Sequence, residues 1–236
     1  PLAFAWLDAW SRHVSPYDIN PLNLNPLRDV LAGLVDFHRL RVKAGPDLFL
    51  AATHVRTGRL RIFERKDLTI DRVLASTCLP QLFRAVDIEG EAYWDGGYLG
   101  NPPLLPFLRA DLPADLLIVS LSPQTIDDVP QSARAILRRL GEITFNASLE
   151  SELRCLAMLP QLLAKAGRPD EEVASVSPLR LHRIGIDSVQ PPLASSSPLN
   201  AEWDVLLRLR DEGRRAAQLF LEHQFDKVGH AATFTP

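Results

Sequence analysis

An acid beside two glycines is the arrangement in this chain with the clearest chemical use. Asp95 is followed by Gly96 and Gly97, and aromatic residues, Trp94 and Tyr98, stand on both sides. Glycines accept positive φ angles and let other groups approach the backbone closely, so backbone geometry would position a carboxylate in this turn. A positioned carboxylate can act as a general base if the group that it deprotonates lies within hydrogen-bond reach. The plain alternative is an Asp-Gly β-turn, the commonest short-range turn signal.

Other side chains with chemical potential have more ordinary explanations. Ser76 stands near the end of a predicted helix, where a serine usually bonds to its own backbone. His54 ends a predicted strand and is the best histidine for a site, with a satisfied, partly buried histidine as the alternative. His38 and His182 are expected to pack. No two of the six histidines have the i, i+4 spacing of a zinc site, and we expect neither a metal nor an organic cofactor.

Two surface features have a functional and a structural reading. Arg134, Arg138 and Arg139 lie on a predicted long helix, where they could attract anionic headgroups or simply form a solvated face. The Pro/Asn-rich segment from Tyr17 to Leu24 carries apolar side chains. This segment could act as a lid or touch a membrane, or it could pack into a groove of its own domain.

The elements that must position Asp95 alternate between helices and strands. Apolar residues at helical spacing predict helices, and alternating or continuous apolar runs predict strands. Thr57-Gly58 and Glu89-Gly90-Glu91 mark tight turns between strands. The predicted helices cover residues 3–13, 27–41, 69–76, about 131–163 and 200–227, with Thr69 or Asp67 as the N-cap of the third. The predicted strands cover residues 47–55, 59–63, 84–88, 92–94, 115–121 and 179–186, and the segments 15–26, 167–177 and 188–198 are predicted loops.

Three short motifs follow one another between residues 47 and 122. Ala52–Gly58 reads A-T-x-x-x-T-G, Ala75–Pro80 reads A-S-x-x-x-P, and Asp95–Gly97 reads D-G-G. The ordered trio resembles the second half of a bacterial patatin-like phospholipase domain. The resemblance implies a Ser-Asp dyad lipid acyl hydrolase in which Asp95 is the catalytic base, and Gly96 and Gly97 form the turn that positions it.

The nucleophile implied by this resemblance is not in the chain. A nucleophile elbow, G-x-S-x-G, needs two glycines four positions apart. Of the twelve glycines, only Gly96 and Gly100 have this spacing, and the residue between them is Tyr98. The glycine-rich oxyanion loop of the family is also absent. We expect both parts to lie before Pro1, which is not an initiator methionine, so the chain by itself should be inactive.

Composition excludes several other classes of protein. With 46% hydrophobic residues, 23% charged residues and a net charge of −3, the sequence lacks the basic footprint of a nucleic-acid binder. No apolar run reaches the roughly 18 residues of a membrane span, and the N-terminal residues lack the features of a signal peptide. Only two cysteines are present, Cys78 and Cys155, which is typical of a reducing compartment. Cys78 is expected to pack as a small hydrophobe.

We therefore expect a single domain over residues 1–236, with an α/β three-layer fold and a mainly parallel central sheet flanked by helices. The expected partners are a lipid or other acyl ester and the absent N-terminal segment, and the expected location is cytoplasmic, with peripheral membrane contact as a further expectation. A catalytically inactive module that binds lipid or protein is the first alternative. An unrelated α/β enzyme, in which Asp95 only makes a turn, is the second.

Overall fold

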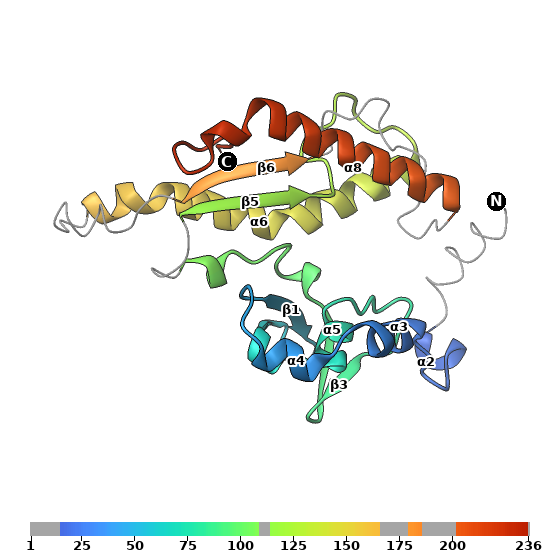
Figure 1. The fold of residues 1–236 in the computed structure, drawn as a ribbon. Helices are drawn as coiled ribbons and strands as arrows, with labels where there is room; N and C mark the ends of the chain where they lie inside the picture. The colour runs from blue at the N-terminus through green and yellow to red at the C-terminus, as the bar shows by residue number, and fades with distance from the viewer. Residues whose placement is uncertain (1–14, 109–113, 166–178, 186–201, 236) are drawn as a thin grey trace. The chain divides into compact units, whose positions relative to one another are not determined.

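Two antiparallel hairpins form the larger sheet in our computed structural model of the chain. The structure describes residues 15–108, 114–165, 179–185 and 202–235. It divides the chain into two units, Pro1–Pro106 and Phe107–Pro236, which are drawn in Figure 1 and are considered separately below. The predicted helix over residues 3–13 and the predicted loops over 167–177 and 188–198 lie outside the described residues.

The sheet of the first unit has the strand order β2-β1-β4-β3, and every neighbouring pair is antiparallel. The tight turns that the sequence predicts connect each hairpin. Gly58 has a φ of 60° between β1 and β2, while Glu89 and Gly90 have φ angles of 59° and 85° between β3 and β4. Two positive φ angles in a row are typical of the type I′ turn, which suits the twist of a hairpin. The four strands are β1 (Phe49–His54), β2 (Arg59–Glu64), β3 (Val86–Ile88) and β4 (Glu91–Asp95).

The described α-helices of the first unit each begin at a residue whose side chain caps the helix. The predicted helix over residues 27–41 is wrong as a single element. The first helix ends at Leu34, and Asp36 caps a second helix by accepting the Arg39 N–H at 2.9 Å. Thr69 is confirmed as an N-cap, since its hydroxyl accepts the Arg72 N–H at 3.3 Å. The predicted loop 15–26 also contains one short helix. The helices are α2 (Pro16–Ile19), α3 (Pro26–Leu34), α4 (Phe37–Val42) and α5 (Ile70–Ala75), with short 3₁₀ helices η1 (Arg65–Asp67), η2 (Gly96–Tyr98) and η3 (Leu105–Phe107).

The core of the first unit lies between the sheet and these helices. Ala52, Phe63 and Tyr93 come from three strands, while Leu68 and Ala75 come from the segment around α5, and all five are buried. The rings of Phe63 and Tyr93 meet edge to face with their centroids 5.8 Å apart. Burial of a Phe side chain contributes about 1.5–3 kcal/mol. This packing fixes the end of β4, where Asp95 stands.

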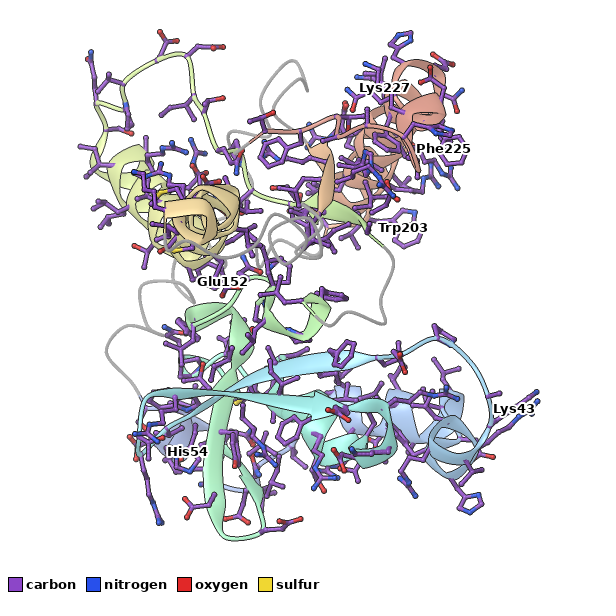
Figure 2. All side chains as sticks on the ribbon, turned by 90° about the vertical axis from the view of Figure 1, so that its left-hand side faces the viewer. Lys43, His54, Glu152, Trp203, Phe225 and Lys227 are labelled. Atoms are coloured by element: carbon purple, nitrogen blue, oxygen red, sulfur yellow. The ribbon has the colours of Figure 1, made fainter. Side chains whose placement is uncertain are left out.

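The second unit holds a two-stranded parallel sheet between two long helices. Figures 1 and 2 show α6 on one face and α8 on the other. On the α8 face, the rings of His182 and Phe220 meet edge to face at 6.3 Å. The elements of this unit are β5 (Asp115–Ser120), α6 (Ala133–Lys165), β6 (Arg180–Gly185), α8 (Trp203–His223) and the 3₁₀ helix η4 (Phe225–Lys227).

A polar cluster around the buried His182 joins the strands of the second unit to the C-terminal segment. The Asp115 carboxylate accepts hydrogen bonds from Arg180 (Nε at 2.9 Å and Nη2 at 2.6 Å) and from the Gly229 amide at 2.9 Å. His182, which is fully buried, lies between Asp115 and the Thr233 hydroxyl, 3.0 Å from each. Together these hydrogen bonds hold the Asp115 pKa well below its usual range. His182 is thus a packing residue, as expected.

The predicted mixture of helices and strands is confirmed, but a mainly parallel central sheet is not. Among the described residues, the larger sheet is wholly antiparallel, and the pair β5–β6 is the only parallel one. The connections explain the difference. The short turns over residues 55–58 and 89–90 can join only antiparallel strands, whereas a parallel pair needs a crossover of a dozen or more residues.

Candidate active site

Both backbone groups of Asp95, its amide and its carbonyl oxygen, are hydrogen-bonded at the end of β4. Asp95 pairs with Ala52 across the sheet. Its amide donates to the Cys78 carbonyl oxygen at 2.9 Å, and its own carbonyl oxygen accepts the Thr53 hydroxyl at 2.8 Å. The segment that follows α5 and the middle of β1 therefore meet at this residue. Both belong to the motifs that the sequence places upstream of the D-G-G turn.

The Asp95 carboxylate is half-buried and is oriented by its own turn. Its Oδ1 atom accepts the Gly97 N–H at 2.8 Å, so Asp95 acts as the N-cap of η2. Burial raises the pKa of this carboxyl above its usual value, and the Gly97 hydrogen bond opposes that change. A raised pKa makes a carboxylate a stronger base once it is ionised. None of the other described residues donates a hydrogen bond to this carboxylate.

Gly96 has no room for a side chain. A Cβ atom at this position would lie 2.3 Å from the Ala51 carbonyl oxygen and 2.6 Å from the Ala51 Cβ. The turn therefore packs directly on the backbone of β1, and glycine is the residue that permits it. The structure thus brings Asp95, Gly96 and Gly97 together in one short turn, while their catalytic role stays a prediction.

Two further side chains lie in the electrostatic field of Asp95. Burial raises the pKa of the Cys78 thiol to about 11, with a smaller contribution from the Asp95 charge, and the thiol donates to the Arg84 carbonyl oxygen at 3.2 Å. Burial also raises the Tyr98 pKa, while Tyr98 donates its hydroxyl to Gln81 at 3.3 Å. Cys78 is confirmed as a packing residue. The sequence does not reveal that Cys78 and Gln81 approach this turn, because only the tertiary contact between α5 and β4 brings them there.

Ser76 and His54, the other two side chains with chemical potential, already have hydrogen-bond partners. Ser76 donates its hydroxyl to the Val73 carbonyl oxygen at 2.8 Å, which is the helix-end bond expected of it. His54, labelled in Figure 2, lies with Nε2 3.0 Å from the Glu91 carboxylate and Nδ1 2.8 Å from the Thr57 hydroxyl. Its ring packs edge to face on Tyr93 at 5.2 Å. His54 is therefore a satisfied, partly buried histidine.

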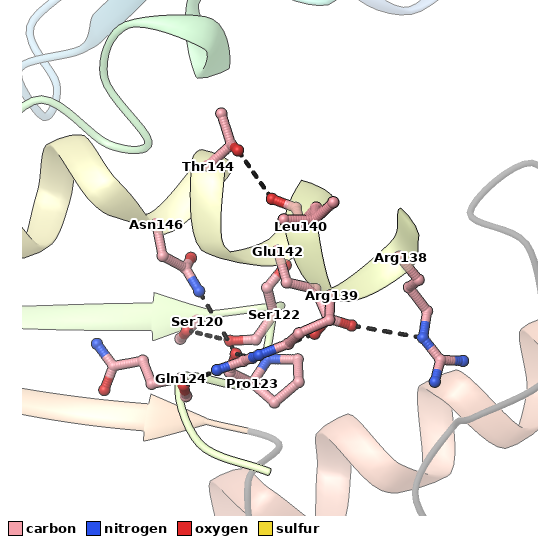
Figure 3. A network of polar contacts seen from close by, with 10 residues as sticks. All are labelled: Ser120, Ser122, Pro123, Gln124, Arg138, Arg139, Leu140, Glu142, Thr144 and Asn146. Atoms are coloured by element: carbon pink, nitrogen blue, oxygen red, sulfur yellow. Dashed lines mark hydrogen bonds and ion pairs between the residues drawn. The ribbon is translucent and has the colours of Figure 1, made fainter. Parts of the chain in front are cut away.

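The arginines of α6 bind protein groups. Arg139 donates to the carbonyl oxygens of Pro123 at 3.2 Å and Gln124 at 2.7 Å, and Arg138 pairs with Glu142 at 3.7 Å. Figure 3 shows how these contacts fasten the segment after β5 to the helix. The side chain of Arg134 lies outside the described residues. A role in attracting anionic headgroups finds no support in these contacts.

The apolar segment near the start of the described chain is only partly packed. Tyr17 lies under the Arg84 guanidinium at 5.1 Å, and its carbonyl oxygen accepts from Arg84 at 2.9 Å. Leu22 and Leu24 are 78% and 66% exposed. The segment is thus anchored at Tyr17 and presents apolar side chains beyond that point.

The described residues contain neither a candidate metal site nor a helix that could span a membrane. No three His, Cys, Asp or Glu side chains in this part of the chain are grouped so that they could hold a metal ion. No described helix combines the length and the apolar character needed to cross a membrane.

Comparison with known proteins points to the first unit. Residues 8–108 match the model of the patatin-like phospholipase family. A search of curated proteins found no match. The matched region includes the three ordered motifs, the turn that holds Asp95 and nearly all of the first unit. Residues 8–108 of this chain are therefore similar to the patatin-like phospholipase family.

Proposed function

We propose that this chain is the base-bearing part of a hydrolase of lipid or other carboxylic esters. Asp95 is the base, and the serine nucleophile comes from a segment outside residues 1–236. The observation that carries the proposal is the Asp95 carboxylate, half-buried and held by the Gly97 N–H within the family-matched region. The intact domain would then have the three-layer fold with a mainly parallel central sheet, as one domain.

The chemistry assigned to Asp95 is proton transfer. A serine hydroxyl is a weak nucleophile until a neighbouring base takes its proton. Asp95 would take that proton as the serine oxygen attacks the ester carbonyl, and would then give it to the leaving alcohol as the acyl-enzyme forms. Water would hydrolyse the acyl-enzyme in a second step of the same kind. Backbone N–H donors of the absent segment would stabilise the oxyanion.

Groups already near Asp95 are unsuited to replace the serine. The hydroxyl of Ser76 is bonded to the Val73 carbonyl oxygen. The Cys78 thiol, with a pKa of about 11, is protonated at neutral pH, and the thiolate is the nucleophilic form of cysteine. These two observations favour a nucleophile from another segment and predict that residues 1–236 alone are inactive.

A binding module without catalysis is the second candidate function. It is favoured by the absence of G-x-S-x-G from the sequence and by exposed apolar side chains on α3 and the loop before it, such as Leu22, Leu24 and Leu34. In this version the protein would bind lipid or a protein partner, and the exposed leucines would make peripheral contact with a membrane from the cytoplasm.

Hydrolysis of p-nitrophenyl butyrate by the natural full-length polypeptide separates the two functions. Asp95→Asn should lower kcat by about 10²–10⁴-fold, the usual contribution of a general base. Asp87→Asn is the matched control, because the Asp87 carboxylate also accepts a turn amide, from Gly90 at 3.0 Å, but is exposed. Unchanged hydrolysis by Asp95→Asn would refute the assignment of Asp95. Absence of hydrolysis in the wild type would favour the binding module.

A further inference from the structure

Thr53 is the buried polar side chain of the first unit. It is 7% exposed, and no other described residue of this unit combines a polar or charged side chain with burial. Thr53 lies in β1, opposite Leu60 of β2 and Trp94 of β4, so it has a paired strand on each side. Buried hydroxyls in folded proteins have hydrogen-bond partners, and the partner that Thr53 has is therefore informative.

This partner is the residue that bears the candidate base. The Thr53 hydroxyl donates to the Asp95 carbonyl oxygen at 2.8 Å. That carbonyl belongs to the peptide group that joins Asp95 to Gly96, and a peptide group is planar. A hydrogen bond to its oxygen therefore fixes the direction in which the chain enters the turn.

The turn needs such a restraint because two glycines follow Asp95. Glycine has more backbone freedom than any other residue, and the Asp95 Oδ1 atom is held at 2.8 Å by the amide of the second glycine, Gly97. Rotation of the Asp95–Gly96 peptide would displace that amide, which lies one peptide further along the chain. The Thr53 hydroxyl opposes this rotation from the neighbouring strand.

We infer that Thr53 is a positioning residue, whose hydroxyl holds the Asp95–Gly96 peptide so that the Gly97 amide meets the Asp95 carboxylate. An apolar residue of the same shape could fill the position in β1 but could not hold the peptide. This positioning is a property of the first unit alone. Its consequence for ester hydrolysis rests on the proposed function.

Titration of the Asp95 carboxyl carbon by nuclear magnetic resonance, in residues 1–236, tests the positioning without any hydrolysis. Thr53→Val nearly keeps the shape and removes the hydroxyl, whereas Thr53→Ser keeps the hydroxyl. The Gly97 hydrogen bond lowers the Asp95 pKa against the effect of burial, so Thr53→Val should raise this pKa further and Thr53→Ser should leave it unchanged. Thr57→Val is the matched control, because the hydroxyl of Thr57 contacts His54 at 2.8 Å instead.

The titration reports on Asp95 because its titratable neighbours stay uncharged. The Cys78 thiol has a pKa of about 11, and burial raises the Tyr98 pKa above its usual value. The resonance is identified by its absence from Asp95→Asn. An Asp95 pKa that is the same in Thr53→Val and in the wild type would overturn the inference. If circular dichroism shows that Thr53→Val is unfolded, Thr53→Ala, which also lacks the hydroxyl, is titrated in its place.

Kinetics of the natural full-length polypeptide separate positioning from function. Thr53→Val should lower kcat for p-nitrophenyl butyrate by about 10–10²-fold with KM nearly unchanged, because a misplaced catalytic group costs rate on this scale. Thr53→Ser should restore kcat. A shifted titration in a protein whose wild type does not hydrolyse esters would support the positioning and refute the proposed enzyme. A shifted titration with unchanged kcat would overturn the consequence for hydrolysis.

Discussion

Gly96 stands directly against the backbone of Ala51, and a Cβ atom at position 96 would lie 2.3 Å from the Ala51 carbonyl oxygen. Gly96→Ala should therefore destabilise the first unit, because the backbone of β1 or of the turn must shift. Overpacking of this kind usually costs about 1–3 kcal/mol. Urea unfolding followed by circular dichroism measures the loss. In the full-length protein, the same substitution should lower ester hydrolysis because it displaces Asp95.

Gly33→Ala is the control for this variant. Gly33 lies in α3, and no atom stands within 4 Å of a Cβ at that position. Alanine is favoured over glycine in a helix by about 1 kcal/mol, so Gly33→Ala should leave stability unchanged or raise it. If the two substitutions had the same effect, the close approach of Gly96 to Ala51 would not be a feature of the protein.

The two cysteines should differ sharply in reactivity. Cys78 is buried with a pKa of about 11, whereas Cys155 is exposed on α6. The thiolate is the reactive form, so a thiol reagent such as DTNB should modify one cysteine per chain at pH 8 under native conditions and both in denaturant. Cys155→Ser should abolish the native reaction, and Cys78→Ser should leave it intact. Rapid native modification of Cys78 would contradict the packing of α5 against β4.

Asp95→Asn should raise stability at pH 7 in residues 1–236. The folded-state pKa of Asp95 lies above its unfolded value of about 3.9, so the folded protein favours the protonated form, and ionisation at neutral pH costs stability. Asparagine can still accept the Gly97 N–H. The gain should vanish as the pH falls below the unfolded pKa, where both states are protonated. Urea midpoints at pH 3 and pH 7 measure it, and a lower midpoint for the variant at pH 7 would contradict the buried position of the carboxylate.

Asp115 should have the opposite pH dependence. Its pKa is lowered by Arg180, by the Gly229 amide and by His182, so the ionised form stabilises the fold above the unfolded pKa of about 3.9. This stabilisation is lost as the pH falls through the folded-state pKa. Asp115→Asn should therefore lower the melting temperature at pH 7 and reduce the dependence of melting on pH below about 4. Asp128→Asn, in an exposed loop, should change neither quantity.

Local patterns in the sequence predict the turn that holds Asp95 and most of the surrounding strands. Gly58 and Gly90 mark the hairpins because their positive φ angles disfavour other residues. Thr69 marks a helix start because its hydroxyl can replace a missing backbone partner. The same reasoning fails at Asp36, where apolar residues keep helical spacing across a break between two helices. Periodicity reports which side chains face the core, and it is insensitive to a change of helix axis.

The pairing of strands that lie far apart in the sequence, such as β1 with β4 and β5 with β6, is not contained in those local patterns. A buried apolar strand such as Asp115–Ser120 is predicted correctly, but its neighbours depend on segments far away in the sequence. The proximity of Cys78 to Asp95 is of the same kind, since it results from a hydrogen bond between residues 17 positions apart. The family resemblance supplies a chemical role for Asp95, and the contacts of the folded chain supply its burial and orientation.

The hydrogen bond between the Gly97 amide and the Asp95 carboxylate has an entropic consequence. Immobilising a rotamer-rich side chain on binding costs about 0.5–1.5 kcal/mol. The Asp95 carboxylate is already held 2.8 Å from that amide in the free chain, so this loss occurs when the turn folds. An incoming hydroxyl would therefore meet an acceptor that needs no further ordering.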